Sequence, residues 1–116
     1  MRDEPLTMSA VPGIEADVTI LKLQGPLTLQ TIFAFQEELA QHKPQLLIID
    51  LSESPYMDSA GLGSLMNGYV SAEKNGRRFL LVGANHRVTA LLETTKVHKI
   101  LKNYPTAADA EASVRT

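Results

Sequence analysis

The pattern of hydrophobic and polar positions predicts strands that alternate with helices. Residues 45–50 (QLLIID) form an uninterrupted aliphatic segment without alternation, which is typical of a central strand buried on both faces. Other segments combine apolar residues with turn residues at their ends, as short strands do. The strands expected besides 45–50 are residues 6–11, 18–24, 78–82 and a last brief one at Ile100 and Leu101.

Apolar residues spaced three and four apart predict helices between these strands. The expected helices are residues 29–42, 60–75, 86–93 and 107–114. Asn85 is the expected N-cap of the third, and Thr106 with Asp109 approximates a capping box for the last. Thr28 is the expected N-cap of the first helix, whose inner face would hold Leu29, Ile32, Phe33, Gln36, Leu39 and Ala40, with Phe33 and Phe35 as anchors. In the second helix the predicted core stripe is Leu62, Leu65, Met66 and Tyr69. A second stripe of small residues, Gly61, Ser64, Gly68 and Ser71, is expected to face outward, either as a locally crowded or solvated face or because a partner approaches it closely.

This order of elements implies an α/β domain with helices packed on a mixed or mostly parallel sheet. The 116 residues suffice for one domain with one hydrophobic core, and we expect residues 1–4 to form a flexible tail and residues 5–116 the domain. The formal charge of −2 gives no electrostatic case for nucleic-acid binding. The longest aliphatic run is a strand's length, so the sequence predicts a cytoplasmic protein that is not inserted in a membrane.

The segment Asp58-Ser59-Ala60-Gly61-Leu62-Gly63 stands where a buried strand and a polar turn, residues 51–57, lead into a helix. The first N–H groups of a helix lack partners within the helix, so Asp58 or Ser59 is a natural N-cap. The same N–H groups favour an anion, including a phosphate carried by Ser59 itself. Ser59 is therefore either a structural cap or the site of a phosphorylation switch.

The stretch LLIIDLSESPYMDSAGLGSLMNGYVSAEKNGRRFLLVG resembles the core of the STAS family, the bacterial anti-sigma factor antagonists. In that family the "DS(S/A)GLG" turn carries the serine that a partner protein kinase phosphorylates, and Ser59 falls on that position. Asp58 matches the preceding acid, Gly61 and Gly63 match the two glycines, and Ala60 replaces a second serine found in many relatives. The resemblance covers about residues 18–112. It implies a mixed sheet of four or five strands flanked by about four helices.

The resemblance implies a binding module and not an enzyme. Its unphosphorylated form would bind an anti-sigma factor with a serine-kinase fold and so free a sigma factor. The kinase would supply ATP and Mg²⁺, a serine phosphatase would reset the switch, and this chain would need no cofactor or metal. The residues expected to contact the partner are Met57, Asp58, Ala60, Gly61, Leu62, Gly63, Ser64, Gly68 and Thr28. Nothing in the sequence indicates an oligomeric state.

Two other functions fit part of the pattern. Thr28 stands where the family usually has an Asp, and this departure is compatible with a STAS scaffold of another sensory complex that is never phosphorylated. Asp50, at the end of a buried strand, superficially resembles the phosphoaspartate of a receiver domain. The segment after residues 18–24 lacks the pair of acids that a receiver's Mg²⁺ site needs, so we expect Asp50 to hydrogen-bond the turn holding Asp58 instead.

Overall fold

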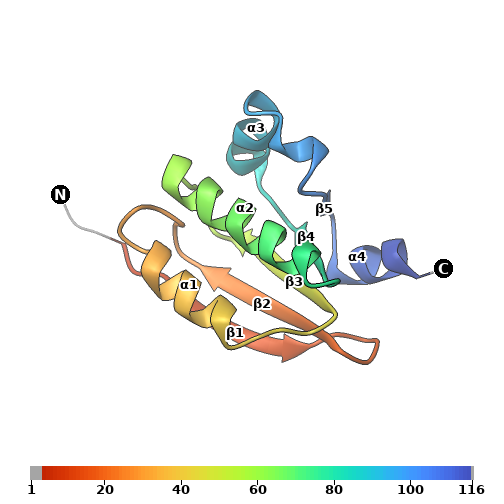
Figure 1. Cartoon of the computed structure of the whole chain (residues 1–116). Helices are drawn as coiled ribbons and strands as arrows, with labels where there is room; N and C mark the ends of the chain where they lie inside the picture. The colour runs from red at the N-terminus through yellow and green to blue at the C-terminus, as the bar shows by residue number, and fades with distance from the viewer. Residues whose placement is uncertain (1–3, 116) are drawn as a thin grey trace.

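The uninterrupted aliphatic segment forms the central strand of the sheet in the computed structural model, which describes residues 4–115. The elements in chain order are β1 (Thr7–Pro12), β2 (Val18–Gln24), α1 (Ile32–Ala40), β3 (Leu46–Glu53), α2 (Ser59–Lys74), β4 (Arg78–Val82), α3 (His86–Thr94), the 3₁₀ turn η1 (Val97–Lys99), β5 (Asn103–Tyr104) and α4 (Ala107–Val114). The strands form a sheet in the order β1-β2-β3-β4-β5, with β1 antiparallel to β2 and the other neighbours parallel (Figure 1). The predicted α/β domain with a mixed sheet of four or five strands and about four helices is confirmed, with five strands in the sheet.

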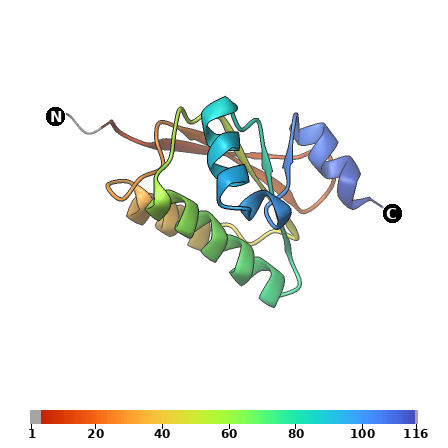
Figure 2. The same cartoon turned by 90° about the horizontal axis from the view of Figure 1, so that it is seen from above.

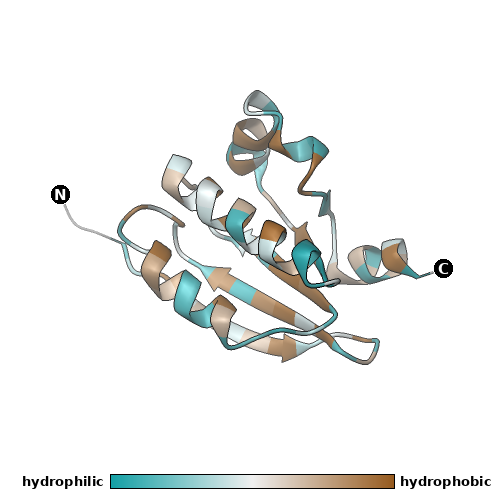
Figure 3. Ribbon diagram, in the orientation of Figure 1, coloured by the Kyte–Doolittle hydropathy of each residue, from teal (hydrophilic) through white to brown (hydrophobic). Residues whose placement is uncertain are grey.

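Successive residues of β3 point to opposite faces of the sheet, and both faces are covered. Leu47, Ile49 and Leu51 pack in the larger core under α1, α2 and α3. Leu46 and Ile48 pack in a smaller core that α4 covers. In Figure 3 the strands of the sheet carry brown, hydrophobic segments, and Figure 2 shows α1 and α2 side by side. The absence of alternation in this segment thus reflects burial on both sides.

The first helix is shorter than predicted and turned differently about its axis. The Thr31 hydroxyl accepts a hydrogen bond from the Thr28 N–H and donates one to the Pro26 carbonyl, so residues 28–31 form a turn and the helix begins at Ile32. Thr28 is therefore not the N-cap. Phe35 is fully buried, whereas Phe33 is 71% exposed. The prediction that both phenylalanines anchor the helix is wrong, because residues two apart lie on nearly opposite sides of a helix.

Two strand boundaries also differ from the prediction. The central strand continues to Glu53, where Gln24 of β2 pairs with it, so the turn before α2 is shorter than residues 51–57. The last strand lies at Asn103–Tyr104, not at Ile100 and Leu101. Leu101 is instead buried in the larger core beside η1.

The predicted tail falls largely outside the described residues, since only Glu4 of it is described. The Glu4 carboxylate accepts a hydrogen bond of 3.2 Å from the Tyr56 hydroxyl, which holds this residue against the loop that precedes α2.

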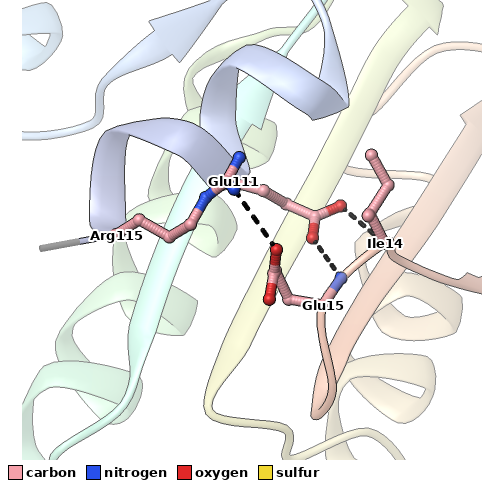
Figure 4. A network of polar contacts seen from close by, with 4 residues as sticks. All are labelled: Ile14, Glu15, Glu111 and Arg115. Atoms are coloured by element: carbon pink, nitrogen blue, oxygen red, sulfur yellow. Dashed lines mark hydrogen bonds and ion pairs between the residues drawn. The ribbon is translucent and has the colours of Figure 1, made fainter.

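A buried glutamate joins the C-terminal helix to the β1–β2 hairpin. Glu111 of α4 is only 1% exposed, and its carboxylate accepts hydrogen bonds from the N–H groups of Ile14 (2.9 Å) and Glu15 (2.8 Å) (Figure 4). Arg115, one turn later in the chain, lies 3.5 Å from the exposed carboxylate of Glu15. The hairpin loop and α4 thus hold each other, although almost a hundred residues separate them in the sequence.

Replacing Glu111 with alanine is expected to lower the free energy of unfolding by about 2 kcal/mol. The change leaves the N–H groups of Ile14 and Glu15 without a hydrogen-bond acceptor in a partly buried place. A buried donor without an acceptor lowers the stability of the folded state. Urea denaturation followed by circular dichroism measures the loss. Glu15→Ala is the control, because it removes an exposed ion pair and should change stability by less than about 1 kcal/mol. Equal effects of the two variants would show that the Glu111 hydrogen bonds contribute little.

Candidate functional site

Helix α2 begins directly at the DSAGLG segment, and Asp58 is its N-cap. The Asp58 carboxylate accepts a hydrogen bond of 2.9 Å from the Gly61 N–H, and its main-chain carbonyl accepts one from the Leu62 N–H. Ser59 is therefore the first residue of the helix and not its cap. Its side chain is exposed. Of the two roles considered for Ser59, the capping role belongs to Asp58.

The second carboxylate oxygen of Asp58 reaches across to the loop between β2 and α1. It accepts a hydrogen bond of 3.1 Å from the Leu29 N–H, while the Asp58 N–H donates to the Leu27 carbonyl. Leu27 also pairs with Met57 in an isolated parallel bridge, and its N–H donates to the Tyr56 carbonyl. These bonds join the β2–α1 loop and the β3–α2 loop into one continuous surface beside Ser59.

This surface exposes large apolar side chains. Leu29, whose N–H Asp58 holds, is 59% exposed, and Phe33 in the first turn of α1 is 71% exposed. The first turn of α1 is correspondingly brown in Figure 3. Exposed apolar groups gathered beside a polar motif are typical of a protein-interaction surface.

The N-terminus of α3 is attached to the same loop. The Asn85 side-chain amide donates a hydrogen bond of 3.0 Å to the Pro55 carbonyl, and the Arg87 guanidinium lies 5.0 Å from the centre of the Tyr56 ring. Burial, and then the nearby Glu4 carboxylate, raise the pKa of Tyr56 above its usual 10.0, although Arg87 acts in the opposite direction. The phenol hydroxyl donates its hydrogen bond to Glu4.

The start of α2 offers hydrogen-bond donors to an anion on Ser59. Within the described residues, the N–H groups of Ser59 and Ala60 have no hydrogen-bond partner. They lie at the positive end of the helix dipole, where a phosphate is stabilised. The nearest negative charge along the chain is the Asp58 carboxylate, which would repel a phosphate on Ser59. This carboxylate already accepts two main-chain hydrogen bonds.

The residues that the sequence predicted as partner contacts differ in accessibility. Asp58 and Gly63 are exposed, and Ala60 and Gly68 are partly exposed. The other predicted contacts are buried: Thr28, Met57, Gly61, Leu62 and Ser64. The outward position predicted for the small residues is wrong for Gly61 and Ser64. A Cβ on Gly61 would lie 2.0 Å from the Leu27 carbonyl oxygen, so this glycine is required by the chain's own packing.

The residues that sequence reasoning missed lie on neighbouring elements. Leu29 was assigned to the inner face of a helix that begins only three residues later. Tyr56 and Arg87 come from a loop and a different helix, and their contact depends on tertiary structure. The only sequence clue was the position of Leu29 directly after Thr28, in the loop that the family resemblance associates with the partner.

Asp50 does not hydrogen-bond the turn that holds Asp58, as the sequence had suggested. Its carboxylate accepts from the Ser52 N–H at 2.9 Å, within the same strand. No group of His, Asp or Glu side chains in the described part of the chain is arranged to hold a metal ion. Among residues 4–115 there is also no helix with the length and hydrophobicity needed to span a bilayer.

Comparisons with known proteins agree with this geometry. The family model for the STAS domain matches residues 8–110. A Thermotoga maritima protein classed as a candidate anti-sigma factor antagonist is 29% identical over 103 residues, which cover 85% of this chain and 91% of that protein. A crystal structure from the same organism, of a candidate anti-sigma factor antagonist, superposes with a TM-score of 0.84 at 26% identity, covering 94% of this chain and 95% of the other.

A more distant structure is that of the Bacillus cell fate determinant SpoIIAA in its phosphorylated form. It superposes with a TM-score of 0.69 at 15% identity and covers 94% of this chain and all of the other. At this level of identity the likeness concerns the fold.

Proposed function

Because this chain belongs to the STAS domain family, we propose that it is an anti-sigma factor antagonist whose partner binding is switched by phosphorylation of Ser59. The two Thermotoga maritima matches with this fold are classed as candidate anti-sigma factor antagonists. The observation that carries the proposal is the exposed Ser59 at the start of α2, with two main-chain N–H groups beside it that have no hydrogen-bond partner among residues 4–115. A kinase can reach this hydroxyl without unfolding any element of the chain.

The proposed partner is an anti-sigma factor that binds the surface formed by the β2–α1 loop, the β3–α2 loop and the first turn of α2. Leu29 and Phe33 supply apolar contact area, while Asp58, Ala60 and Gly63 surround Ser59. Met57, Gly61, Leu62, Ser64 and Thr28 support this surface from beneath instead of contacting the partner. The kinase brings ATP and Mg²⁺, and a serine phosphatase reverses the modification.

The switch requires no change of fold. Phosphorylation adds about −1.5 to −2 charges beside Asp58. In the free protein, water and the α2 N-terminus stabilise that charge. In the complex the phosphate loses water and meets the Asp58 carboxylate, and a poorly compensated charge at an interface is strongly unfavourable.

Phosphorylation of one residue is the direct test. We expect a candidate serine kinase partner to add one phosphoryl group to the wild-type chain, as measured by intact-mass spectrometry. The Ser59→Ala variant should gain none. Ser113→Ala, which removes an exposed hydroxyl on α4, is the matched control and should be labelled normally. Undiminished labelling of Ser59→Ala would place the modification elsewhere.

A second role fits the buried position of Thr28. Its side chain is 8% exposed and its hydroxyl donates to the Gln30 side chain at 3.0 Å, so it offers a partner neither charge nor a free hydroxyl where the family usually has an acid. This favours a STAS scaffold in another sensory complex. A scaffold predicts that wild-type protein binds its partner but is never phosphorylated, which the same mass measurement decides.

A further inference from the structure

We propose that the groove between the C-terminal halves of α1 and α2 binds a small anionic amphiphile, a carboxylate with a short apolar tail. The groove has a volume of about 300 Å³ and lies between the two helices that run side by side in Figure 1. Its floor is apolar and is formed by Leu47, Ala72 and Phe79. Ser59 does not line the groove, so this proposal is independent of the proposed function.

The side chains at one end of the groove are basic. His42 and Lys43 follow α1, and Arg77 follows α2. The His42 ring is engaged by the Glu38 carboxylate, whose oxygen lies 3.0 Å from Nε2. Within the described residues, Lys43 and Arg77 form no ion pair, and Arg77 is only partly exposed.

No acidic side chain lines the groove, although the whole chain carries a formal charge of −2. The basic end is thus a local exception to the charge of the protein, and an anion is the ligand that complements it. An apolar floor with a few converging charged groups is the usual composition of a small-molecule site.

The small residues of α2 keep the groove open. Gly68 is partly exposed, and a Cβ there would lie 2.8 Å from the Phe79 ring and 3.2 Å from Leu39. The glycine therefore lets Phe79 pack directly under the helix, where it forms part of the floor. Ser71, one turn later, is exposed and also lines the groove. A larger residue at position 71 would fill it.

The volume selects the size of the ligand. About 300 Å³ is the lower end of the range for ligand pockets. It fits a molecule of roughly ten non-hydrogen atoms, such as octanoate, with its tail along Phe79 and its carboxylate between Lys43 and Arg77.

Titration of ¹⁵N-labelled protein with octanoate tests the site. We expect saturable shifts of the Gly68, Ser71 and Arg77 amide signals with a dissociation constant below about 1 mM. Octylammonium, which has the same tail and the opposite charge, should bind at least tenfold more weakly. Arg77→Glu should weaken octanoate binding at least tenfold, and Ser71→Phe should abolish the shifts.

Arg78→Glu is the matched control. Arg78 is the next residue, is exposed, does not line the groove and lies 3.9 Å from Glu73, so its replacement should change octanoate binding by less than about twofold. The proposal is overturned if octanoate gives no saturable shifts or octylammonium binds equally well. It is also overturned if Arg77→Glu binds like wild type, because Arg77 would then serve only the negative end of α2.

Discussion

The Ser59→Glu variant is expected to bind the anti-sigma factor partner at least about a hundredfold more weakly than wild type while keeping its stability. A hundredfold loss corresponds to about 2.7 kcal/mol. One carboxylate placed in the interface beside Asp58 can supply that difference, since it must lose water without gaining a cation. The free protein should tolerate the charge, because Ser59 is exposed at the positive end of α2.

Isothermal titration calorimetry with the purified partner measures the affinity, and thermal melting measures the stability. Ser59→Ala should bind like wild type and should resist inhibition by kinase and ATP. Ser113→Glu adds the same charge on α4, which packs against the opposite face of the sheet, and should leave binding unchanged. Wild-type affinity of Ser59→Glu would show that charge at this position does not control the complex. An equal loss in Ser113→Glu would show that net charge, and not position, is responsible.

The parts of the fold that the sequence predicted are those where local chemistry and burial agree. Residues 46–49 have no polar residue to face solvent, which identifies a strand buried on both sides. The last helix begins as predicted because Thr106 and Asp109 bond each other across its first turn. Asn85 likewise caps α3 by accepting from the Val88 N–H at 2.8 Å.

The start of α1 could not be predicted, because it depends on a contact between two threonines. The pattern places Thr28 as a good cap, but the Thr31 hydroxyl takes up the Thr28 N–H and the Pro26 carbonyl and delays the helix. With the start shifted, Phe35 points inward and Phe33 outward. Periodicity alone does not decide between them, since both are equally apolar.

The candidate site was predicted in its motif but not in its surroundings. The position of Asp58 and Ser59 at a helix start follows from the order strand, turn and helix. Gly61 and Ser64 of α2 were assigned to the wrong side, because a glycine required by close internal packing looks the same in the sequence as one left open for a partner. Gly61 and Gly63 show the two cases two residues apart.

Replacing Gly61 with alanine is therefore expected to destabilise the protein by about 3 kcal/mol, whereas Gly63→Ala should stabilise it. The Cβ of an alanine at position 61 would lie 2.0 Å from the Leu27 carbonyl oxygen. That oxygen cannot move without breaking the hydrogen bond that it accepts from the Asp58 N–H. Losses of this size arise from such forced shifts of packed backbone. A Cβ on Gly63 meets nothing within 4 Å, so alanine there should add about 0.5 to 1 kcal/mol through its higher helix propensity.

Urea denaturation of the two variants gives the comparison, with each serving as the control for the other. Similar stability of Gly61→Ala and wild type would mean that the two loops move apart easily and that the surface beside Ser59 is not held as rigidly as its hydrogen bonds imply. Gly63 is exposed one turn from Ser59, so its alanine variant should also be measured for partner binding. A variant that is more stable but binds more weakly would place the partner directly on this turn, because the fold itself gives no reason for a glycine there.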